Sequence, residues 1–276
     1  MYASAEQVCQ PVEIQDLKEK ASSEKQVKVH GAVHIIREMG DVSFVLLRMA
    51  HGIIQCVYDK AAAQFDLNEI GEEDCVEVTG TLHEEKRSPN GFEIRMQQIQ
   101  VLSKPAEALP VSINKRKMNL SLETELANRP LVLRNGERRA RFRVQEGIVR
   151  GFRDFLHTQG FTEIHTPKIG AASAEGGSNV FKLDYFGKKA FLAQSPQFYK
   201  QMLVGVYERV YEVGPVFRAE KHSTARHLNE YVSMDFEMGY IHGFEEIMDM
   251  EAAMLSYTFR LLEKEYANEL KALGQN

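Results

Sequence analysis

The chain has 276 residues with a net charge of −5, 43% apolar and 26% charged residues, which is ordinary for a globular protein and long enough for two domains. The sequence contains no apolar run near the roughly 18 residues of a membrane span, and its N-terminus resembles neither a secretory signal nor a transit peptide. We therefore expect a cytoplasmic protein with no membrane partner. Cys9, Cys56 and Cys75 form no C-x-x-C pair, which argues against a disulfide framework or a zinc site.

Residues 25–103 have the pattern of short β-strands. Apolar residues recur near period two between Val27 and Arg37, and Ser88-Pro89-Asn90-Gly91 has the chemistry of a hairpin turn. The further strands that we expect cover residues 43–48, 53–58, 75–82 and 92–96 running into 99–102, with a short helix at 60–65. Three strands, a small helix and two more strands predict a five-stranded barrel of the OB type, and another small β-barrel is the alternative.

A linker follows this barrel. Residues 104–112 contain Pro105 and Pro110, which break the strand pattern, and the basic cluster Lys115-Arg116-Lys117 comes next. This composition predicts a hinge between two domains. The basic cluster either contacts nucleic-acid phosphates or is a solvated part of the linker.

The second half of the chain changes to a helical period. One face of a long helix is formed by Phe142, Gln145, Ile148, Val149, Phe152, Phe155 and Leu156. We expect Gly160 to end this helix as a C-cap, and Ser195-Pro196 to begin another helix that runs to about Gly205. The remaining elements that we expect are strands at 162–164, 190–193, 209–220 and 228–241 and a helix over 244–273.

Residues 216–231 carry a group of side chains that suits a nucleotide. If two strands pair here as a hairpin, Arg218 projects from the first strand, the loop adds Arg226 and His227, and Tyr231 offers a ring on the return strand. Guanidinium groups bind phosphates in a fork, and a flat ring stacks on a base. On residue types alone, an exposed polar hairpin with surface charges is the alternative.

Four blocks of sequence carry a family resemblance. The pattern F-R-x-E, a loop and R-H-L-x-E-[FY] at 217–231 resembles motif two of class II aminoacyl-tRNA synthetases in the aspartyl and asparaginyl subgroup. Residues 160–167, ending in a proline, resemble motif one. Residues 175–181 resemble the loop that closes over the amino acid, and 194–201 resemble the block that selects aspartate. The similarity runs from about residue 25 to the end and favours the archaeal/eukaryotic-like aspartyl type.

The resemblance implies an α+β fold. We expect an N-terminal extension at 1–24, a five-stranded OB-fold β-barrel that binds the anticodon at 25–104, a hinge at 105–134 and a class II synthetase catalytic domain at 135–276. The catalytic domain would be built on the antiparallel sheet of the class. It is partial, because motifs one and two are recognisable and motif three is absent.

The implied function is that of an aspartate–tRNA ligase. Such an enzyme uses ATP, with Mg²⁺, to convert L-aspartate to aspartyl-adenylate and then transfers the aspartyl group to tRNA(Asp). We also expect a homodimer, because motif one builds the dimer interface throughout the family; Pro167 would lie at the centre of that interface. Ala32 stands at a position that is often tryptophan in relatives, which makes tRNA(Asn) a second candidate partner.

Aspartate recognition falls mainly on one lysine. Lys200 would meet the side-chain carboxylate of the substrate as a compact positive charge, and a neutral amide there would leave a buried ammonium unpaired. Ser195 and Gln197 would hydrogen-bond the α-amino end, and Asp235 and Glu175 would supply it with negative charge. The resemblance assigns aspartate binding to Glu175, Ser195, Gln197, Lys200, Arg218 and Asp235.

The ATP site is assigned in the same way. Arg218 is the expected catalytic residue, because it would bridge the amino-acid carboxylate and the α-phosphate and stabilise the charge as the carboxylate attacks. Glu220 would bind the adenine amino group, Tyr231 would stack on the ring, and Glu237 would lie near the nucleotide and a metal ion. The resemblance assigns ATP binding to Arg218, Glu220, Arg226, His227, Leu228, Tyr231 and Glu237.

The barrel carries the expected anticodon site. Phe44 occupies the position where the family stacks a base, Gln55 and Glu93 match positions that contact base edges, and Arg37 is placed to hold a backbone phosphate. Taken alone, Phe44 fits the barrel core equally well.

Three explanations for the missing motif three remain. The chain is a truncated product or fragment, one half of a split enzyme, or a paralogue that binds tRNA without catalysis. Because Lys200, Arg218 and Asp235 are all present, we favour the first. An asparaginyl-tRNA synthetase is the remaining alternative, and Lys200 disfavours it.

Overall fold

The computed structural model describes residues 12, 14–63, 65–172, 180–222, 224 and 227–275. The chain divides into two compact units, Met1–Gly136 and Glu137–Asn276. None of the described helices is long and apolar enough to cross a membrane.

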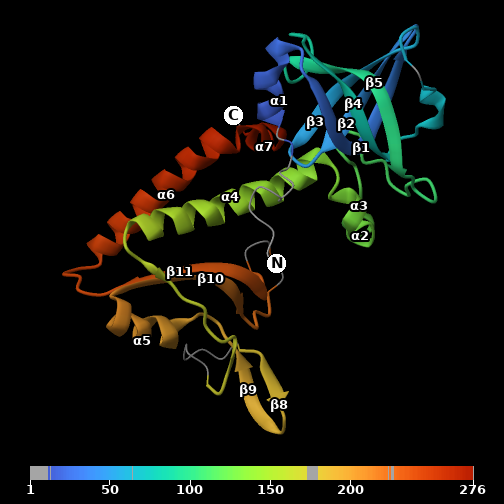
Figure 1. The fold of residues 1–276 in the computed structure, drawn as a ribbon. Helices are drawn as coiled ribbons and strands as arrows, with labels where there is room; N and C mark the ends of the chain where they lie inside the picture. Colours follow the sequence, from blue (N-terminus) through green and yellow to red (C-terminus); the bar gives the residue numbers. More distant parts are fainter. Residues whose placement is uncertain are drawn as a thin grey trace, which may run out of the picture. The chain divides into compact units, whose positions relative to one another are not determined.

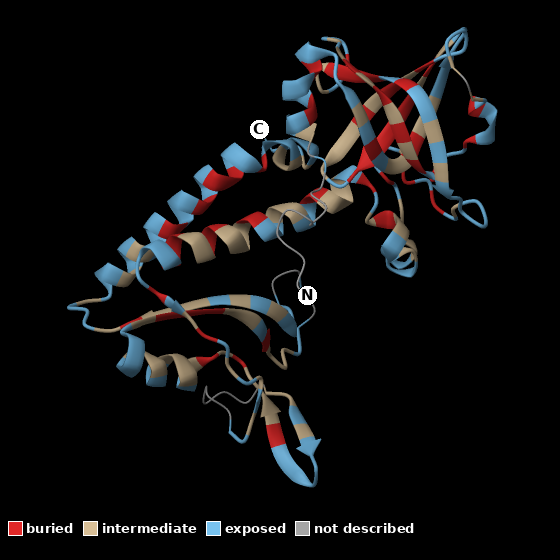
Figure 2. Cartoon of the chain, in the orientation of Figure 1, coloured by how far each residue is buried: buried red, intermediate tan, exposed pale blue. Residues whose placement is uncertain are grey.

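The first unit is built on a closed five-stranded barrel (Figure 1). The strands run in the order β1-β2-β3-β5-β4, which confirms the expected barrel; their bounds are β1 Gln26–Met39, β2 Val42–Met49, β3 Gly52–Asp59, β4 Cys75–Glu84 and β5 Phe92–Ser103. On β4, Val76, Val78 and Leu82 point inward and are fully buried, as the period-two pattern predicts. Figure 2 shows the buried residues gathered inside the barrel.

Gly80 allows β4 and β5 to approach closely where the barrel curves. A Cβ atom at this position would lie 2.3 Å from the carbonyl oxygen of Arg95, so no other residue fits without a shift of the backbone. The register between the two strands slips between Thr79 and Gly80, which marks a bulge.

The short helix expected at 60–65 is wrong. Turns follow β3, where the carboxylate of Asp59 accepts a hydrogen bond from the backbone of Ala61 (2.9 Å), and the 3₁₀ helix η3 forms later, at Leu67–Glu69. Asp66 caps η3 by accepting from the backbone nitrogen of Asn68. Aspartate side chains compete for backbone donors and so move the helix start.

The barrel unit also contains helical segments at both ends of its chain. Helix α1 (Ile14–Lys20) and the 3₁₀ helix η2 (Ala21–Ser23) precede the barrel, and Leu17 buries itself in its core. After β5, the chain forms α2 (Leu122–Ala127) and α3 (Arg129–Val132). Val132 of α3 packs in a small apolar cluster with Ile113; its other buried members are Val111 and Met118.

A buried ion pair ties this later segment to the barrel. Glu73 is 6% exposed, and its carboxylate accepts hydrogen bonds from both terminal guanidinium nitrogens of Arg48, at 2.6 and 2.7 Å. Arg134 donates to the same carboxylate at 3.0 Å. Burial raises the pKa of Glu73, but the hydrogen bonds and charges of Arg48 and Arg134 outweigh it and hold that pKa below its usual value.

The second unit contains a three-stranded sheet in the order β11-β10-β6. Figure 1 shows α4 and α6 on one side of this sheet and α5 on the other. The elements are α4 Gly136–Thr158, β6 Thr162–Glu163, α5 Gln197–Tyr207, β10 Arg209–Phe217, β11 Glu230–Met238, α6 Glu245–Glu265 and α7 Ala267–Ala272. A second small sheet has the order β7-β9-β8, with β7 Ile169–Gly170, β8 Lys182–Tyr185 and β9 Lys188–Leu192.

The two faces of the β10–β11 pair differ. Tyr211, Phe236 and Met238 pack on one face against an aromatic group of α4 that includes Phe152 and Phe155. The antiparallel register places Glu212 directly opposite Asp235 and Val210 opposite Glu237, which gives the other face a row of polar side chains. The α+β fold expected from the sequence is therefore confirmed.

Several expected boundaries differ in this unit. Gly160 ends α4 with φ +78°, as expected of a C-cap. Strands β10 and β11 are shorter than expected, because the chain leaves the sheet at Phe217 and returns at Glu230. Pro196, not Ser195, is the N-cap of α5, and the final helix is two helices separated at Tyr266.

Candidate functional site

Lys200 is the centre of the polar sheet face. Helix α5 presents its ammonium nitrogen 3.2 Å from Asp235 Oδ1 and 3.3 Å from Glu237 Oε2. The three side chains are 13%, 18% and 31% exposed, respectively, so these contacts are largely shielded from water. Ser233 donates to the second oxygen of Asp235 at 2.5 Å. Three of the residues assigned from the sequence therefore meet in one charged cluster.

The charges of this cluster suit a substrate that carries both a carboxylate and an ammonium group. Two carboxylates share one ammonium, so Lys200 is held by groups that also attract the ammonium of an amino acid. An incoming carboxylate would exchange one of these contacts for another of the same kind, so that the lysine would stay in place. Such preorganisation is what a specific binding site requires.

Ser195 contributes a hydroxyl to the same region. Its Oγ atom is buried and has no hydrogen-bond partner among the residues that the structure describes. It lines a cavity of about 120 Å³ together with Pro167, Phe198 and Tyr199. Since buried polar atoms are almost always paired, a buried hydroxyl beside a cavity is available to a ligand. Gln197 follows as the first residue of α5.

Glu212 and Lys168 are part of this site and were missed by the sequence analysis. Glu212 is 4% exposed and accepts hydrogen bonds from the backbone nitrogen (2.7 Å) and hydroxyl (2.8 Å) of Thr166 and from Lys168 Nζ (2.7 Å). A Cβ atom on Gly214 would lie 3.3 Å from Lys168, so the glycine makes room for the lysine. A glutamate inside an otherwise apolar strand was the available signal.

The turn fixed by Glu212 supports the next two blocks of the site through the backbone. The backbone nitrogen of Ala193 donates to the carbonyl of Lys168 at 2.9 Å, and Phe217 donates to the carbonyl of Ala193 at 2.9 Å. Ala193 leads into Ser195, and Phe217 leads into Arg218. A buried carboxylate on β10 thus sets the position of segments that are far apart in sequence.

The loop after β10 begins with an ordered turn around Arg218. Its backbone nitrogen donates to the carbonyl of Asn229 at 2.9 Å, and Glu220 donates back to the carbonyl of Arg218 at 2.8 Å. The side-chain amide of Asn229, with its nitrogen toward the loop, donates to the carbonyl oxygens of Arg218 (3.2 Å) and Glu220 (3.1 Å). These hydrogen bonds hold the backbone of Arg218 and Glu220 in place where the chain leaves β10.

The remaining residues assigned to ATP lie on or near this loop. Tyr231 is the cross-strand partner of Val216. Because side chains alternate along a strand, Tyr231 lies on the same face of β11 as Ser233 and Asp235. His227 accepts or donates a 2.7 Å hydrogen bond with the hydroxyl of Thr224, and Leu228 is 53% exposed. Glu175 and Arg226 lie outside the described residues.

The metal assignment rests on one carboxylate. No group of three or more His, Cys, Asp or Glu side chains with the spacing of a metal site occurs in the described part of the chain. Glu237 supplies a single carboxylate, and Mg²⁺ is commonly held by one or two carboxylates together with substrate phosphates. The Glu237 carboxylate fits a metal that arrives with a nucleotide.

The residues assigned to the anticodon share the outer face of the barrel. Arg37 and Phe44 are direct cross-strand partners on β1 and β2. Gln55 on β3 donates to Glu93 on β5 at 3.2 Å, which orients the amide across the strand pair. The neighbours of Phe44 along the strand point inward, and Val45 is fully buried, so Phe44 faces away from the barrel core.

Comparisons with known proteins agree with both units. The model of class II tRNA synthetases (D, K and N) matches residues 121–274, and that of an OB-fold nucleic acid binding domain matches 27–102. The aspartate–tRNA(Asp/Asn) ligases of Deinococcus radiodurans and Thermus thermophilus are 44% and 42% identical over 90% and 92% of this chain. The chain spans 56% and 59% of their lengths.

A solved structure gives the same result for the fold. The asparaginyl-tRNA synthetase from Pyrococcus horikoshii, complexed with asparaginyl-adenylate, superposes with a TM-score of 0.83 at 28% identity. The match covers 96% of this chain and 61% of that chain. With a family model that covers more than half of its residues, the chain belongs to the class II tRNA synthetases of the D, K and N group.

Proposed function

We propose that the whole protein to which this sequence belongs is an aspartate–tRNA ligase that uses ATP and Mg²⁺. The observation that carries the proposal is the contact of Lys200 with Asp235 and Glu237 on the polar face of the sheet, beside Ser195. The names of the relatives that are 44% and 42% identical support the same substrate.

In the first step, an oxygen of the aspartate α-carboxylate attacks the α-phosphorus of ATP, and pyrophosphate leaves from the opposite side. The carboxylate is already ionised at neutral pH, so no general base is needed. Arg218 would stabilise the charge that develops on the α-phosphate, and Tyr231 would hold the adenine ring. When bound, Mg²⁺ would supply positive charge to the phosphates, and Glu237 would hold it. In the second step, a terminal hydroxyl of the tRNA takes the aspartyl group and AMP leaves.

Lys200 is the residue on which selection of aspartate rests. Its ammonium would pair with the substrate's side-chain carboxylate, whereas the neutral amide of asparagine brings no opposite charge to it. Asparaginyl-tRNA synthetase is the second candidate, because a solved structure of that enzyme has a TM-score of 0.83 to this chain. Asp235 would attract the substrate ammonium in either case.

Recognition of tRNA would belong to the barrel. Phe44 would stack a base of the anticodon, Gln55 and Glu93 would read base edges, and Arg37 would hold a phosphate. We propose tRNA(Asp) as the partner, with tRNA(Asn) as the second candidate. A cytoplasmic homodimer with Pro167 at its interface completes the proposal.

ATP–pyrophosphate exchange by the whole protein tests the proposed activity. The expected result is exchange that depends on aspartate and is at least tenfold weaker with asparagine at equal concentration. Binding of a tRNA(Asp) transcript is measured in parallel by fluorescence anisotropy. Exchange driven by asparagine would favour the second candidate, and tRNA binding without any exchange would favour a tRNA-binding module without catalysis.

A further inference from the structure

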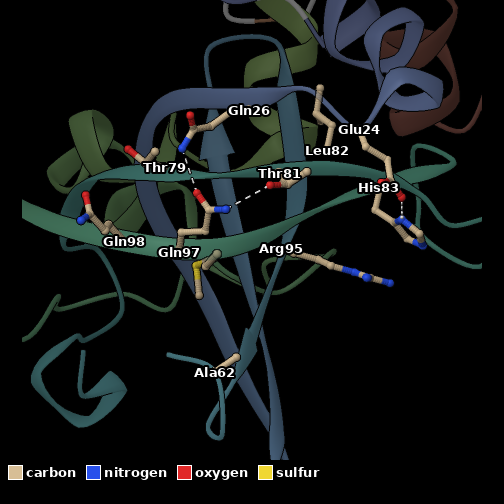
Figure 3. Close-up of a pocket in the computed structure, with 11 residues that line it drawn as sticks. Glu24, Gln26, Ala62, Thr79, Thr81, Leu82, His83, Arg95, Gln97 and Gln98 are labelled. Atoms are coloured by element: carbon tan, nitrogen blue, oxygen red, sulfur yellow. Dashed lines mark hydrogen bonds and ion pairs between the residues drawn. The ribbon is translucent and has the colours of Figure 1, made fainter. Parts of the chain in front are cut away.

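The outer face of strands β4 and β5 contains a polar hollow that the assigned sites do not use. Its volume is about 620 Å³, within the range of small-ligand pockets. Amide, hydroxyl and charged side chains line it, as Figure 3 shows. Its polar lining residues include Gln26, Thr79, Thr81, Arg95, Gln97 and Gln98.

Two hydrogen bonds fix the middle of this hollow. Gln26 Nε2 donates to Gln97 Oε1 at 2.9 Å, and Gln97 Nε2 donates to Thr81 Oγ1 at 3.2 Å. The Gln97 amide therefore has a set orientation, and Gln97 and Thr81 each keep a donor that is not used in this chain of bonds. Amide and hydroxyl groups held in this way match the edge of a nucleobase.

Arg95 lies at the border of the hollow, and its guanidinium forms no ion pair with the described residues of the barrel unit. Its side chain is exposed and makes no hydrogen bond or ion pair with any residue in the described part of the barrel unit. By contrast, the nearby carboxylate of Glu24 is in contact with His83 at 3.2 Å. A guanidinium without an internal partner is suited to an external phosphate or to the face of a base.

The strand register connects Arg95 to the assigned anticodon face. Arg37 pairs with Phe44, Phe44 with Val57, Val57 with Arg95, and Arg95 with Thr81. These residues form one row across the five strands, with their side chains on the same outer face. Two strand spacings separate Phe44 from Arg95, a distance of about 10 Å.

We propose that the β4–β5 hollow binds one further unpaired nucleotide of the same RNA strand whose bases bind at Phe44. This proposal rests on the proposed function of the barrel. Arg95 contacts the phosphate or base at the border, and the edge of that base is read by Gln97 and Thr81. The hollow offers the Arg95 guanidinium, several neutral polar groups and the Glu24 carboxylate, which is already in contact with His83. This polar composition suits a nucleotide better than a lipid surface or an apolar peptide.

Binding of a fluorescent tRNA(Asp) transcript by the full chain tests the proposal. Arg95→Ala should weaken binding about fivefold or more, the lower range for a lost base contact, and should reduce the slope of log K against log salt by about 0.7. Gln97→Ala should weaken binding a few-fold without changing the slope. The matched controls are Gln100→Ala on the same strand and Lys18→Ala on α1, both exposed and outside the hollow, which should stay within twofold.

Phe44→Ala separates this proposal from the function on which it rests. If Phe44→Ala weakens binding but Arg95→Ala and Gln97→Ala do not, the proposed nucleotide site in the hollow is overturned. The proposed anticodon site at Phe44 then still stands. Absence of tRNA binding by the unsubstituted chain overturns both. Hydroxyl-radical footprinting gives a second readout: the Arg95→Ala chain should lose protection of a nucleotide that Phe44→Ala still protects. Unchanged thermal unfolding of each variant shows that folding is not the cause.

Discussion

At the scale of single residues, the two units share one device, a buried ion pair that holds backbone segments together. Glu73 joins Arg48 of the barrel to Arg134, which precedes α4, and Glu212 joins β10 to the turn at Thr166 and Lys168. Removing one member of such a pair leaves a buried charge without a partner, which costs far more than the pair contributes. Both glutamates are therefore expected to be sensitive positions.

The first prediction concerns Lys200. Lys200→Ala should weaken aspartate binding about 10- to 100-fold, because a hydrogen bond to a charged group contributes about 1.5–3 kcal/mol. Isothermal titration of the chain with aspartate measures the effect. Lys189→Ala, which removes an exposed lysine of β9, is the control and should bind as the unsubstituted chain does. Equal affinity of the two variants would remove the argument for aspartate.

The second prediction concerns Glu73 and pH. Its pKa in the folded chain is lowered, so its stabilising effect is present above the unfolded value of about 4.3 and is lost as the pH falls through the folded pKa. Glu73→Gln should cost about 3–5 kcal/mol at pH 7. The difference should shrink towards pH 3, as measured by urea unfolding at both pH values. Glu38→Gln, at an exposed carboxylate of β1, is the control, and a pH-independent difference for Glu73→Gln would contradict the prediction.

At the scale of elements, the contact between α4 and α6 depends on glycine. A Cβ atom on Gly147 would lie 2.7 Å from Leu262, and one on Gly151 would lie 2.7 Å from the hydroxyl of Thr258. Around this contact, Leu262 and Tyr266 are buried against Ile148. The two helices approach closely because α4 has no side chain at these positions, although glycine is a poor helix former.

The third prediction concerns Gly151, where α4 and α6 approach closely. Gly151→Ala should destabilise the chain by about 1–2 kcal/mol, because overpacking costs about 1–3 kcal/mol and exceeds the gain of up to about 1 kcal/mol in helix propensity. Gly205→Ala on α5 is the matched control, since no described atom lies within 4 Å of its added Cβ. That control should raise the free energy of unfolding by up to about 1 kcal/mol. Chemical unfolding measures both, and stabilisation by Gly151→Ala would show that the helices separate easily.

At the scale of the whole molecule, the two units differ in how completely they bury their apolar surface. The described strands of the barrel close into one sheet without an open edge. Among the described residues, 18 buried apolar residues from the strands and the adjoining helical segments form one core. In the second unit, apolar side chains on the β11 strand remain exposed, with Val232 at 50% and Met234 at 39%. Exposed apolar surface of this kind is typical of regions that meet another part of a protein or a partner.

The fourth prediction follows from the closed barrel. A fragment of residues 1–136 should fold alone, because its core and the Glu73–Arg134 contact lie within the unit. It should unfold cooperatively by circular dichroism and bind a tRNA(Asp) anticodon stem-loop with an affinity within about threefold of the full chain. A fragment that is unfolded in solution would show that the barrel needs the second unit.

The parts of the fold that the sequence predicted are those with a local period. Alternation along β1 and β4 predicted the barrel, the turn at 88–91 predicted the hairpin, and Gly160 predicted the end of α4. The short helix at 60–65 was predicted in the wrong place, because Asp59 and Asp66 redirect the backbone by side-chain hydrogen bonds. The predicted N-cap at Ser195 was wrong: Pro196 is the N-cap of α5, and the Ser195 hydroxyl bonds to no backbone nitrogen among the described residues.

The sequence by itself determined the family, the barrel and the identity of Lys200, Asp235 and Arg218 as the residues to examine. The tertiary structure decided the contacts of Glu212 and Glu73 and the row from Phe44 to Arg95. Glu212 is 46 residues from Thr166 and Glu73 is 61 residues from Arg134, so no local period links them. The physical reason is that cross-strand register brings distant side chains together, and register is fixed by packing of the folded chain.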